Sequence, residues 1–227
     1  MSIRLFFLVS FLVLAAQFAA AENSGEQLEL CDSGVKEACF NYGLLLSEGK
    51  DVAQDQSRAR SFFEKSCASG LLQSCFVLGR HLMDGRGGQI DRPRGLELYR
   101  AACDGGYAVA CNDLALELKP APSASADYTN YLSRLNQACD LGSPGGCYNL
   151  GMAILNGAAP KDMSKATRSL DIACDNAHSG ACFNLALLFA YGDGVKADNA
   201  KAESYMWSAC DLGDREACGY ASKYFPR

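Results

Sequence analysis

The chain is 227 residues long and carries a formal net charge of −5, with 21 Lys and Arg against 26 Asp and Glu. An acidic chain of this kind lacks the basic footprint that attracts nucleic acid or an anionic membrane, so we expect neither as a partner. The length would suit one ordinary globular domain. The spacing of its 12 cysteines indicates a one-dimensional array of repeats instead.

The amino-terminal residues have the pattern of a secretory signal peptide, which we place at 1–21. A short positive segment ends at Arg4, an apolar core follows over Leu5–Ala16, and Ala19–Ala21 are the small residues that signal peptidase needs. The core is too short to span a bilayer of roughly 30 Å as a helix. We expect cleavage near Ala21 and Glu22 and a soluble, secreted or periplasmic chain, with an uncleaved anchor as the alternative. Disulfides persist in such an oxidising compartment.

The cysteines form six pairs of identical spacing, each C-x7-C. The first members recur every 36 residues, with one step of 35 between Cys139 and Cys174. The pairs are Cys31 and Cys39, Cys67 and Cys75, Cys103 and Cys111, Cys139 and Cys147, Cys174 and Cys182, and Cys210 and Cys218. The regularity marks a repeat as well as a redox state.

Each repeat also carries helix signals at fixed places. An aspartate that can cap a first helical turn stands twelve residues before the first cysteine: Asp55, Asp91, Asp127, Asp162 and Asp198. A glycine that suits a helix end stands three residues after it, at Gly34, Gly70, Gly106, Gly142 and Gly213, with Ala177 as the one departure. A second glycine follows a further apolar-periodic segment, at Gly49, Gly85, Gly157 and Gly192. Each repeat is therefore predicted to be a helical hairpin.

The cysteine spacing indicates where the chain turns. Residues eight apart on one continuous helix lie roughly 12 Å apart, whereas a disulfide needs Cα atoms within about 7 Å. The chain must therefore turn between the two cysteines, and the glycine supplies the turn. Pairing within each C-x7-C is the economical choice among roughly ten thousand connectivities. Each bridge would contribute about 2 to 3 kcal/mol.

Zinc is the alternative use for these cysteines. The chain has no C-x-x-C and only two histidines, His81 and His178, so the ligand spacing of structural zinc sites is missing. We expect no metal and no cofactor. His81 falls in a second helix and His178 in a turn, and we expect a surface or capping role for both.

Three segments carry a family resemblance: Lys65–Gly70, Ala138–Gly142 and Gly146–Gly151. They resemble Sel1-like repeats, which are tetratricopeptide-type helical hairpins, in a variant with two cysteines per repeat. Tyr191–Val195 matches the glycine-rich turn of that family. With its signal peptide, the chain is most similar to the secreted Helicobacter cysteine-rich proteins. The resemblance implies an all-α fold, a right-handed α–α superhelix or solenoid of hairpins.

We therefore predict a single solenoid of about six repeats over 22–227. Its approximate repeats are 22–54 (a partial first repeat), 55–90, 91–126, 127–161, 162–197 and 198–227 (a truncated last repeat). The proline-rich segment Lys119–Ala126 cannot continue a helix and is predicted to be an extended connector.

Stacked hairpins suit the binding of an extended peptide or another protein, which is the leading functional hypothesis, for a chain expected to be monomeric. Polar residues ten positions after the first cysteine form a ladder that could bind peptide backbone: Asn41, Asp113, Asn149 and Asn184. The alternative is that these side chains tie adjacent repeats together. Trp207, the only tryptophan, is a candidate exposed anchor, with packing in the core as the alternative.

A second ladder is basic and lies in the first turn of each first helix. It consists of Arg58, Arg94, Lys165 and Lys201. These cations oppose the helix dipole. They could contact acidic partners or form a solvated edge.

Enzymatic activity is the rival hypothesis and rests on the resemblance alone. It implies binding of penicillins and weak hydrolysis of β-lactams, with a β-lactam or a peptidoglycan-like, cell-wall-derived molecule as ligand. Ser33 with Lys36 and Ser47 with Lys50 match S-x-x-K, but no S-D-N or K-T-G accompanies them, so no catalytic residue is identified. A third hypothesis, a respiratory assembly factor of the mitochondrial intermembrane space, is disfavoured by the secretory peptide.

Overall fold

A computed structural model describes residues 24–121 and 127–226, so the predicted signal peptide lies outside the described residues. All regular secondary structure in these ranges is α-helical. The chain divides into two compact units at Gly105 and Gly106, here called unit 1 and unit 2, and each is described by itself. Within the described ranges, no helix has the length and apolar character needed to cross a membrane.

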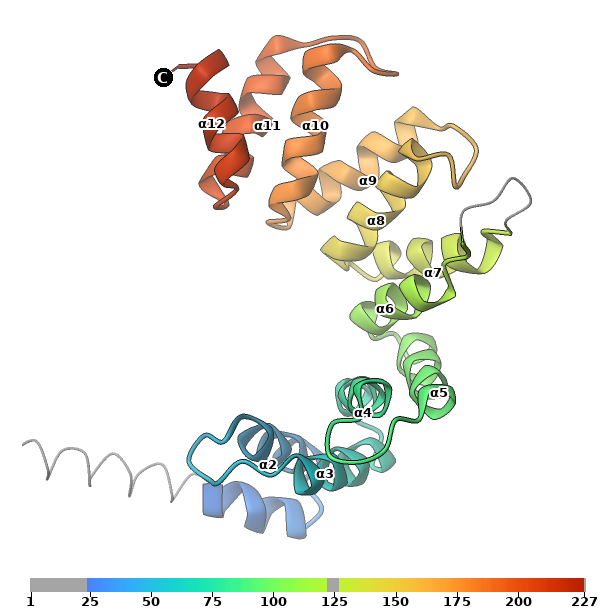
Figure 1. The fold of residues 1–227 in the computed structure, drawn as a ribbon, viewed down its shortest axis with the longest axis vertical. Helices are drawn as coiled ribbons and strands as arrows, with labels where there is room; N and C mark the ends of the chain where they lie inside the picture. Colours follow the sequence, from blue (N-terminus) through green and yellow to red (C-terminus); the bar gives the residue numbers. More distant parts are fainter. Residues whose placement is uncertain (1–23, 122–126, 227) are drawn as a thin grey trace, which may run out of the picture. The chain divides into compact units, whose positions relative to one another are not determined.

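Helices follow one another as hairpins in both units (Figure 1). Unit 1 holds a helix over 24–32, α2 (Lys36–Glu48), α3 (Gln56–Ala68), α4 (Leu72–Asp84) and α5 (Arg92–Asp104). Unit 2 holds α6 (Ala108–Leu118), α7 (Thr129–Asp140), α8 (Pro144–Leu155), α9 (Met163–Asp175), α10 (Ser179–Tyr191), α11 (Asn199–Asp211) and α12 (Arg215–Tyr224). The prediction of an all-α solenoid of hairpins is confirmed.

The predicted aspartate caps begin four of the first helices. The carboxylates of Asp55, Asp91, Asp162 and Asp198 each accept from the backbone N–H three residues on, at 2.9 to 3.1 Å. The prediction is wrong for Asp127, because α7 has Tyr128 as its N-cap. Asp127 accepts from the N–H of Thr129, the first residue of α7, at 2.9 Å, and so closes a turn at the start of the helix instead of capping it. Hydrogen bonds from Thr129 lower the pKa of Asp127.

The connector between α6 and α7 begins as predicted. α6 ends at Leu118 and Lys119 is extended, with φ −63° and ψ 119°. Pro120 follows, and a residue that precedes proline disfavours the helical region. Residues 122–126 of the predicted connector lie outside the described residues.

The bend between first and second helix is the same in every repeat. The residue three positions after the first cysteine has a φ between 84° and 98° where it is glycine, and 64° at Ala177. Five predicted disulfides close this bend, with Cα atoms 4.4 to 4.8 Å apart: Cys31–Cys39, Cys67–Cys75, Cys139–Cys147, Cys174–Cys182 and Cys210–Cys218. Cys103 and Cys111 are disulfide-bonded as well, and no cysteine is free.

Small residues allow second helices to approach the following first helix closely. A Cβ placed on Gly79 of α4 would lie 3.1 Å from the carbonyl oxygen of Gly95 in α5, and one on Gly95 would lie 3.0 Å from that of Gly79. In unit 2, a Cβ on Gly151 of α8 would lie 2.7 Å from the Leu170 side chain of α9. Backbone contact of this kind sets the spacing between successive hairpins.

The two histidines have different environments. His178 is the N-cap of α10, where its Nδ1 accepts from the N–H of Ala181 at 3.2 Å, so the expected capping role is right. His81 is only 3% exposed and lies edge-on to Phe63, so the expected surface or capping role is wrong for it. Its Nδ1 has no hydrogen-bond partner among the residues that the structure describes, because the helix turns this side chain toward the apolar core of unit 1.

The left-handed alanine gives a stability prediction. An L-residue with a side chain is strained by about 1 kcal/mol in this region, so Ala177→Gly should raise the free energy of unfolding by up to that amount. The matched control is Gly142→Ala, at the same place in the preceding repeat, where an added Cβ would meet nothing within 4 Å. It should lower stability by a similar amount in urea unfolding curves of the oxidised protein. Equal stability of all three proteins would contradict the assignment.

We expect the protein to lose stability in mild acid because of its two histidines. Burial lowers the pKa of His81 and of His178, and nearby arginines lower that of His81 further. The unfolded chain then binds protons more readily, so their contribution to stability is complete above pH of about 6.5 and declines below it.

Urea unfolding at pH 7.5 and pH 5.0 measures this decline. The difference in stability between the two pH values should shrink in His178→Asn, which can still cap the helix, and in His81→Leu. Leucine suits the second site because Leu45 and Leu188 occupy its place in other repeats. An unchanged difference in both variants would show that carboxylates alone cause the acid response.

Candidate functional site

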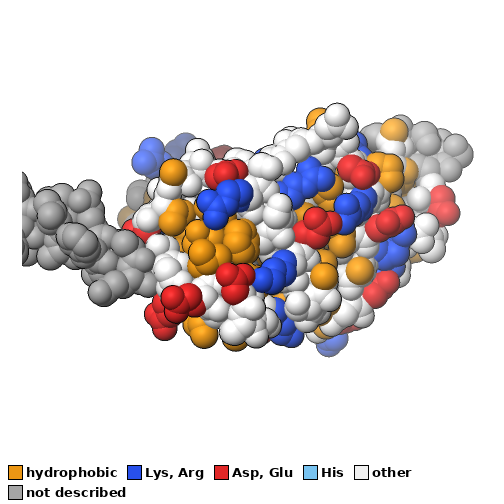
Figure 2. All heavy atoms as spheres, turned by 90° about the horizontal axis from the view of Figure 1, so that it is seen from below, with side chains coloured by type: hydrophobic (Ala, Val, Ile, Leu, Met, Phe, Trp, Pro, Cys, Tyr) orange, Lys and Arg blue, Asp and Glu red, His pale blue; other side chains and the backbone are white. Residues whose placement is uncertain are grey.

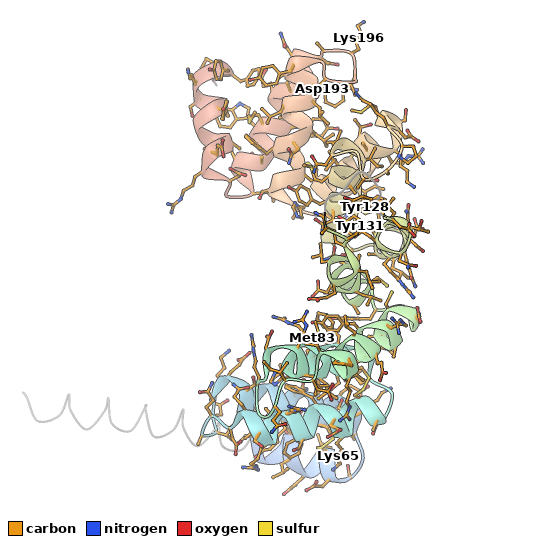
Figure 3. The ribbon with its side chains drawn as sticks, turned by 45° about the vertical axis from the view of Figure 1, so that its right-hand side comes forward. Lys65, Met83, Tyr128, Tyr131, Asp193 and Lys196 are labelled. Carbon is orange, nitrogen blue, oxygen red and sulfur yellow. A yellow bond between two sulfur atoms is a disulfide. The ribbon has the colours of Figure 1, made fainter. Side chains whose placement is uncertain are left out.

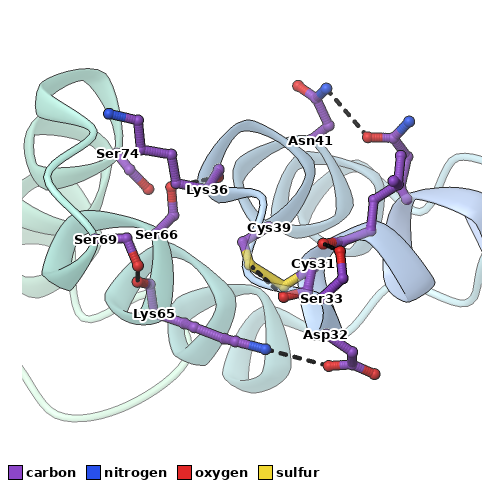
Figure 4. The surroundings of a disulfide bond; sticks show 12 residues. Cys31, Asp32, Ser33, Lys36, Cys39, Asn41, Lys65, Ser66, Ser69 and Ser74 are labelled. Atoms are coloured by element: carbon purple, nitrogen blue, oxygen red, sulfur yellow. Dashed lines mark hydrogen bonds and ion pairs between the residues drawn. A yellow bond between two sulfur atoms is a disulfide. The ribbon is translucent and has the colours of Figure 1, made fainter.

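The first disulfide lies in a network that holds helices together (Figure 4). Asn41 of the predicted ladder donates through Nδ2 to Gln27 Oε1 at 3.2 Å and so joins α2 to the helix over 24–32. Lys65 forms an ion pair with Asp32 at 3.2 Å. The Asn41 amide therefore links two helices, as the alternative interpretation of the ladder expects.

Two further ladder residues lie in a chain of side-chain hydrogen bonds in unit 2. Asn149 of α8 donates to Asn112 Oδ1 at 2.8 Å, and Asn112 of α6 donates to Asp113 Oδ1 at 3.1 Å. The chain joins the second helices of two successive repeats. Here too the polar groups engage each other, which leaves them less able to bind a ligand backbone.

Asn184 is the ladder residue that lines a hollow. Its Nδ2 donates to the carbonyl of Gly180 at 2.7 Å. The hollow lies between α8 and α10, has a volume of about 290 Å³ and is bordered by the exposed ring of Tyr191. Asp193 lies at its rim, in the loop that follows α10, and Figure 3 labels this residue and Lys196 in that loop.

Trp207 is half-buried in α11 and packs against the core of unit 2. Its indole N–H donates to the carbonyl of Phe225 at 3.1 Å. The side chain thus fastens the segment after α12 to α11, in accord with the packing alternative.

A larger hollow, the α7/α9 hollow, opens between two first helices of unit 2. Its volume is about 630 Å³. Polar and charged side chains dominate its lining, with Ile172 as an apolar residue that is 38% exposed. The principal lining residues are Asn136, Asp140, Asp162, Ser164, Lys165, Arg168 and Ile172.

A second hollow, the α9/α11 hollow, adjoins the first and has a volume of about 380 Å³. Ser164 and Arg168 line both hollows. The rings of Phe189 and Tyr205 stack at 5.8 Å in the second one, and Lys201 Nζ lies 4.9 Å from the Phe189 ring centre. The two hollows form a continuous polar face along α7, α9 and α11, here called the first-helix face.

One hydrogen bond arranges the charges of the α9/α11 hollow. Tyr205 donates its hydroxyl to Asp171 Oδ1 at 2.7 Å. Burial and the Asp171 carboxylate raise the pKa of Tyr205, so the hydroxyl stays protonated. Part of the negative charge of Asp171 is therefore already compensated within the protein.

The cations on the first helices differ in whether they form an ion pair within the protein. Arg94 of α5 forms an ion pair with Glu64 of α3. In unit 2, neither Lys165 nor Arg168 forms an ion pair or a side-chain hydrogen bond with the part of the chain that the structure describes. Lys165 and Arg168 of α9 are therefore able to receive an acidic group from a ligand.

Sequence reasoning missed Asn136 and Arg168. Neither residue recurs at its place in the other repeats: the places equivalent to Arg168 hold Ser61, Glu97, Ser133 and Ser204. Lys165 belongs to the basic ladder. The signal that could have found the others is a departure from the repeat pattern.

The serines of the two S-x-x-K matches are engaged in local contacts. Ser33 donates to the carbonyl of Leu30 at 2.7 Å, and Ser47 donates to Gln56 Oε1 at 3.2 Å. Lys50 forms an ion pair with Glu48, and that hydrogen-bonded carboxylate raises the pKa of the lysine. A lysine held protonated is a poor general base, so these contacts favour structural roles.

Charged side chains of both signs are interspersed on the face that Figure 2 shows. On the face shown in Figure 2, Lys and Arg side chains lie between Asp and Glu side chains, around a group of hydrophobic side chains. A charged ligand on such a surface is recognised by a local arrangement rather than by a broad field.

Comparison with solved structures gives matches of the same fold. A protective antigen of uropathogenic Escherichia coli with an SLR fold matches with a TM-score of 0.73 and 23% identity, over 90% of this chain and 44% of the antigen. A Sel1 repeat protein from Oxalobacter formigenes matches with a TM-score of 0.70 and 19% identity, over 88% of this chain and 86% of that one. This chain thus spans less than half the length of the antigen.

A third match is cysteine-rich protein B of Helicobacter pylori, with 27% identity and a TM-score of 0.46, over 59% of this chain and 98% of that one. No curated protein matches the sequence.

The model of the Sel1 repeat matches four segments: 36–71, 72–107, 144–178 and 179–214. Together they cover more than half of the chain, and each runs from a second helix through the following first helix. Those helices are the pairs packed through small residues such as Gly79 and Gly95. The helical hairpins, their glycine bends and this match together show that the chain belongs to the Sel1 repeat family.

Proposed function

We propose that this protein is a secreted or periplasmic repeat scaffold that binds a protein or an extended peptide on the first-helix face of unit 2. Sel1 repeats generally mediate protein–protein interactions. The observation that carries the proposal is the pair of adjoining hollows that share Ser164 and Arg168. A single small ligand would need one enclosed cavity, whereas a row of open hollows suits successive side chains of an extended chain.

The cysteines support the proposed compartment. All of them are disulfide-bonded, which requires an oxidising environment such as the periplasm or the exterior of the cell. The predicted signal peptide over 1–21 would deliver the chain there. A mitochondrial assembly role would need a different targeting signal.

Binding is favoured over hydrolysis by the chemistry of the described residues. The contacts of Ser33 and Ser47 engage their hydroxyls locally, and Lys50 is held by Glu48. The first-helix face offers hydrogen-bonding and charged groups that suit the binding of a peptide.

Peptide selection on the oxidised full-length protein tests this function. Ser164→Trp fills the place where the two hollows meet, and it should weaken the selected peptides more than about tenfold in fluorescence polarisation titrations, because the ring excludes the ligand from both. Ser57→Trp is the matched control: Ser57 is exposed and lies at the same place in α3, ten residues before the first cysteine. It should leave affinity unchanged.

Two results would contradict the proposal. One is failure to enrich any peptide on the wild-type protein while the disulfides are intact. The other is equal weakening by both tryptophan variants, which would place binding elsewhere.

A further inference from the structure

A register comparison between the units suggests what the first-helix face recognises. In unit 1, Arg94 forms an ion pair with Glu64. Arg94 stands nine residues before the first cysteine of its repeat, and Glu64 stands three residues before the first cysteine of the preceding repeat. The pair joins two successive first helices. The corresponding residues between α7 and α9 are Lys165 and Asn136.

The α7/α9 position therefore has the cation without the acid. Lys165 and Asn136 both line the α7/α9 hollow, and Arg168 lies one turn further along α9. Among the residues that the structure describes, neither cation has an ion-pair partner. The unpaired cations thus surround a space where unit 1 holds a carboxylate.

Carboxylates near the hollow do not fill this role. Asp162 is occupied as the N-cap of α9, accepting from the N–H of Lys165 at 2.9 Å. Asp171 accepts from the Tyr205 hydroxyl. Asp140 is exposed at the end of α7 and makes no ion pair with either cation. The two carboxylates that line the hollow thus leave both Lys165 and Arg168 without an ion pair within the described residues.

We propose that the α7/α9 hollow binds a glutamate or aspartate side chain of an extended peptide, which takes the place that Glu64 holds opposite Arg94 in unit 1. This assignment rests on the proposed peptide-binding function and adds the chemical class of the ligand. Lys165 and Arg168 supply charge-assisted hydrogen bonds to the carboxylate.

The other groups of the hollow suit a peptide rather than a free anion. Asn136 donates its Nδ2 to the carbonyl of Leu132 at 2.7 Å, so its Oδ1 is available to accept from a peptide N–H. Ile172 offers an exposed apolar contact for the residue beside the acid. The expected ligand sequence has an acidic residue next to a hydrophobic one.

The decisive variant restores the acid within the protein. Asn136→Glu places a carboxylate opposite Lys165 and should weaken selected peptides by about tenfold or more, because it repels their acid and engages the cation. Asn136→Gln keeps the amide and has the length of glutamate without its charge, so it should weaken the selected peptides far less than Asn136→Glu does. An unfolding temperature at or above that of the wild-type protein, measured for both variants, would show that the fold is kept.

Removing the positive charges of Lys165 and Arg168 on α9 provides an independent test. Lys165→Gln and Arg168→Gln should each weaken acidic peptides several-fold, with a loss that diminishes at high ionic strength. Arg58→Gln is the matched control, since Arg58 stands at the same place in α3 and lies outside the α7/α9 hollow. Equal losses from Arg58→Gln would show a general charge effect and overturn the proposal.

The outcomes separate this inference from the peptide-binding function. The selected peptides could carry no acidic residue and bind Asn136→Glu as well as the wild-type protein, while Ser164→Trp still prevents their binding. That result would support the peptide-binding function and overturn the carboxylate assignment. Inorganic phosphate, added at constant ionic strength, could displace a bound acidic peptide as effectively as the same peptide without its label does. That result would show a general anion site and would also overturn the carboxylate assignment.

Discussion

The bend after the first cysteine of each repeat is the constraint on which the rest of the structure depends. Its central residue has a positive φ even where alanine replaces glycine, at Ala177. In five of the hairpins, a disulfide closes the bend with Cα atoms no more than 4.8 Å apart. Because the bend recurs at one place in each repeat, every second helix starts in the same register. The faces that successive helices present to one another therefore repeat as well.

Disulfides and packing stabilise different helix pairs. Within each unit, a second helix packs more extensively on the following first helix than on its own hairpin partner. Gly79 and Gly95 illustrate why, since their backbones approach too closely to admit side chains. The family segments, such as 72–107, contain these closely packed pairs. The disulfides join the two helices of one hairpin, which pack less extensively on each other. A covalent link there adds most to the stability that packing provides.

The ligand site that we propose lies at a place where successive repeats differ. In the ion pair of Arg94 with Glu64, a ladder cation is neutralised by the preceding first helix. At the corresponding place between α7 and α9, Asn136 stands where the acid would be, and Lys165 borders an open hollow. Polar residues that recur at one place in the repeats, such as Asn41 and Asn149, form hydrogen bonds with neighbouring side chains and hold the array together.

The sequence by itself determined the helical hairpins, the cap at Asp55 and the disulfide between Cys31 and Cys39, because each depends on backbone geometry within about a dozen residues. It did not reveal the burial of His81, the hydrogen bond of Asn149 to Asn112, or the hollow beside Lys165. Those features arise between residues 18 or more positions apart, on helices brought together by packing. Local patterns carry no record of which side chain stands opposite which across that distance, so only the tertiary structure decided them.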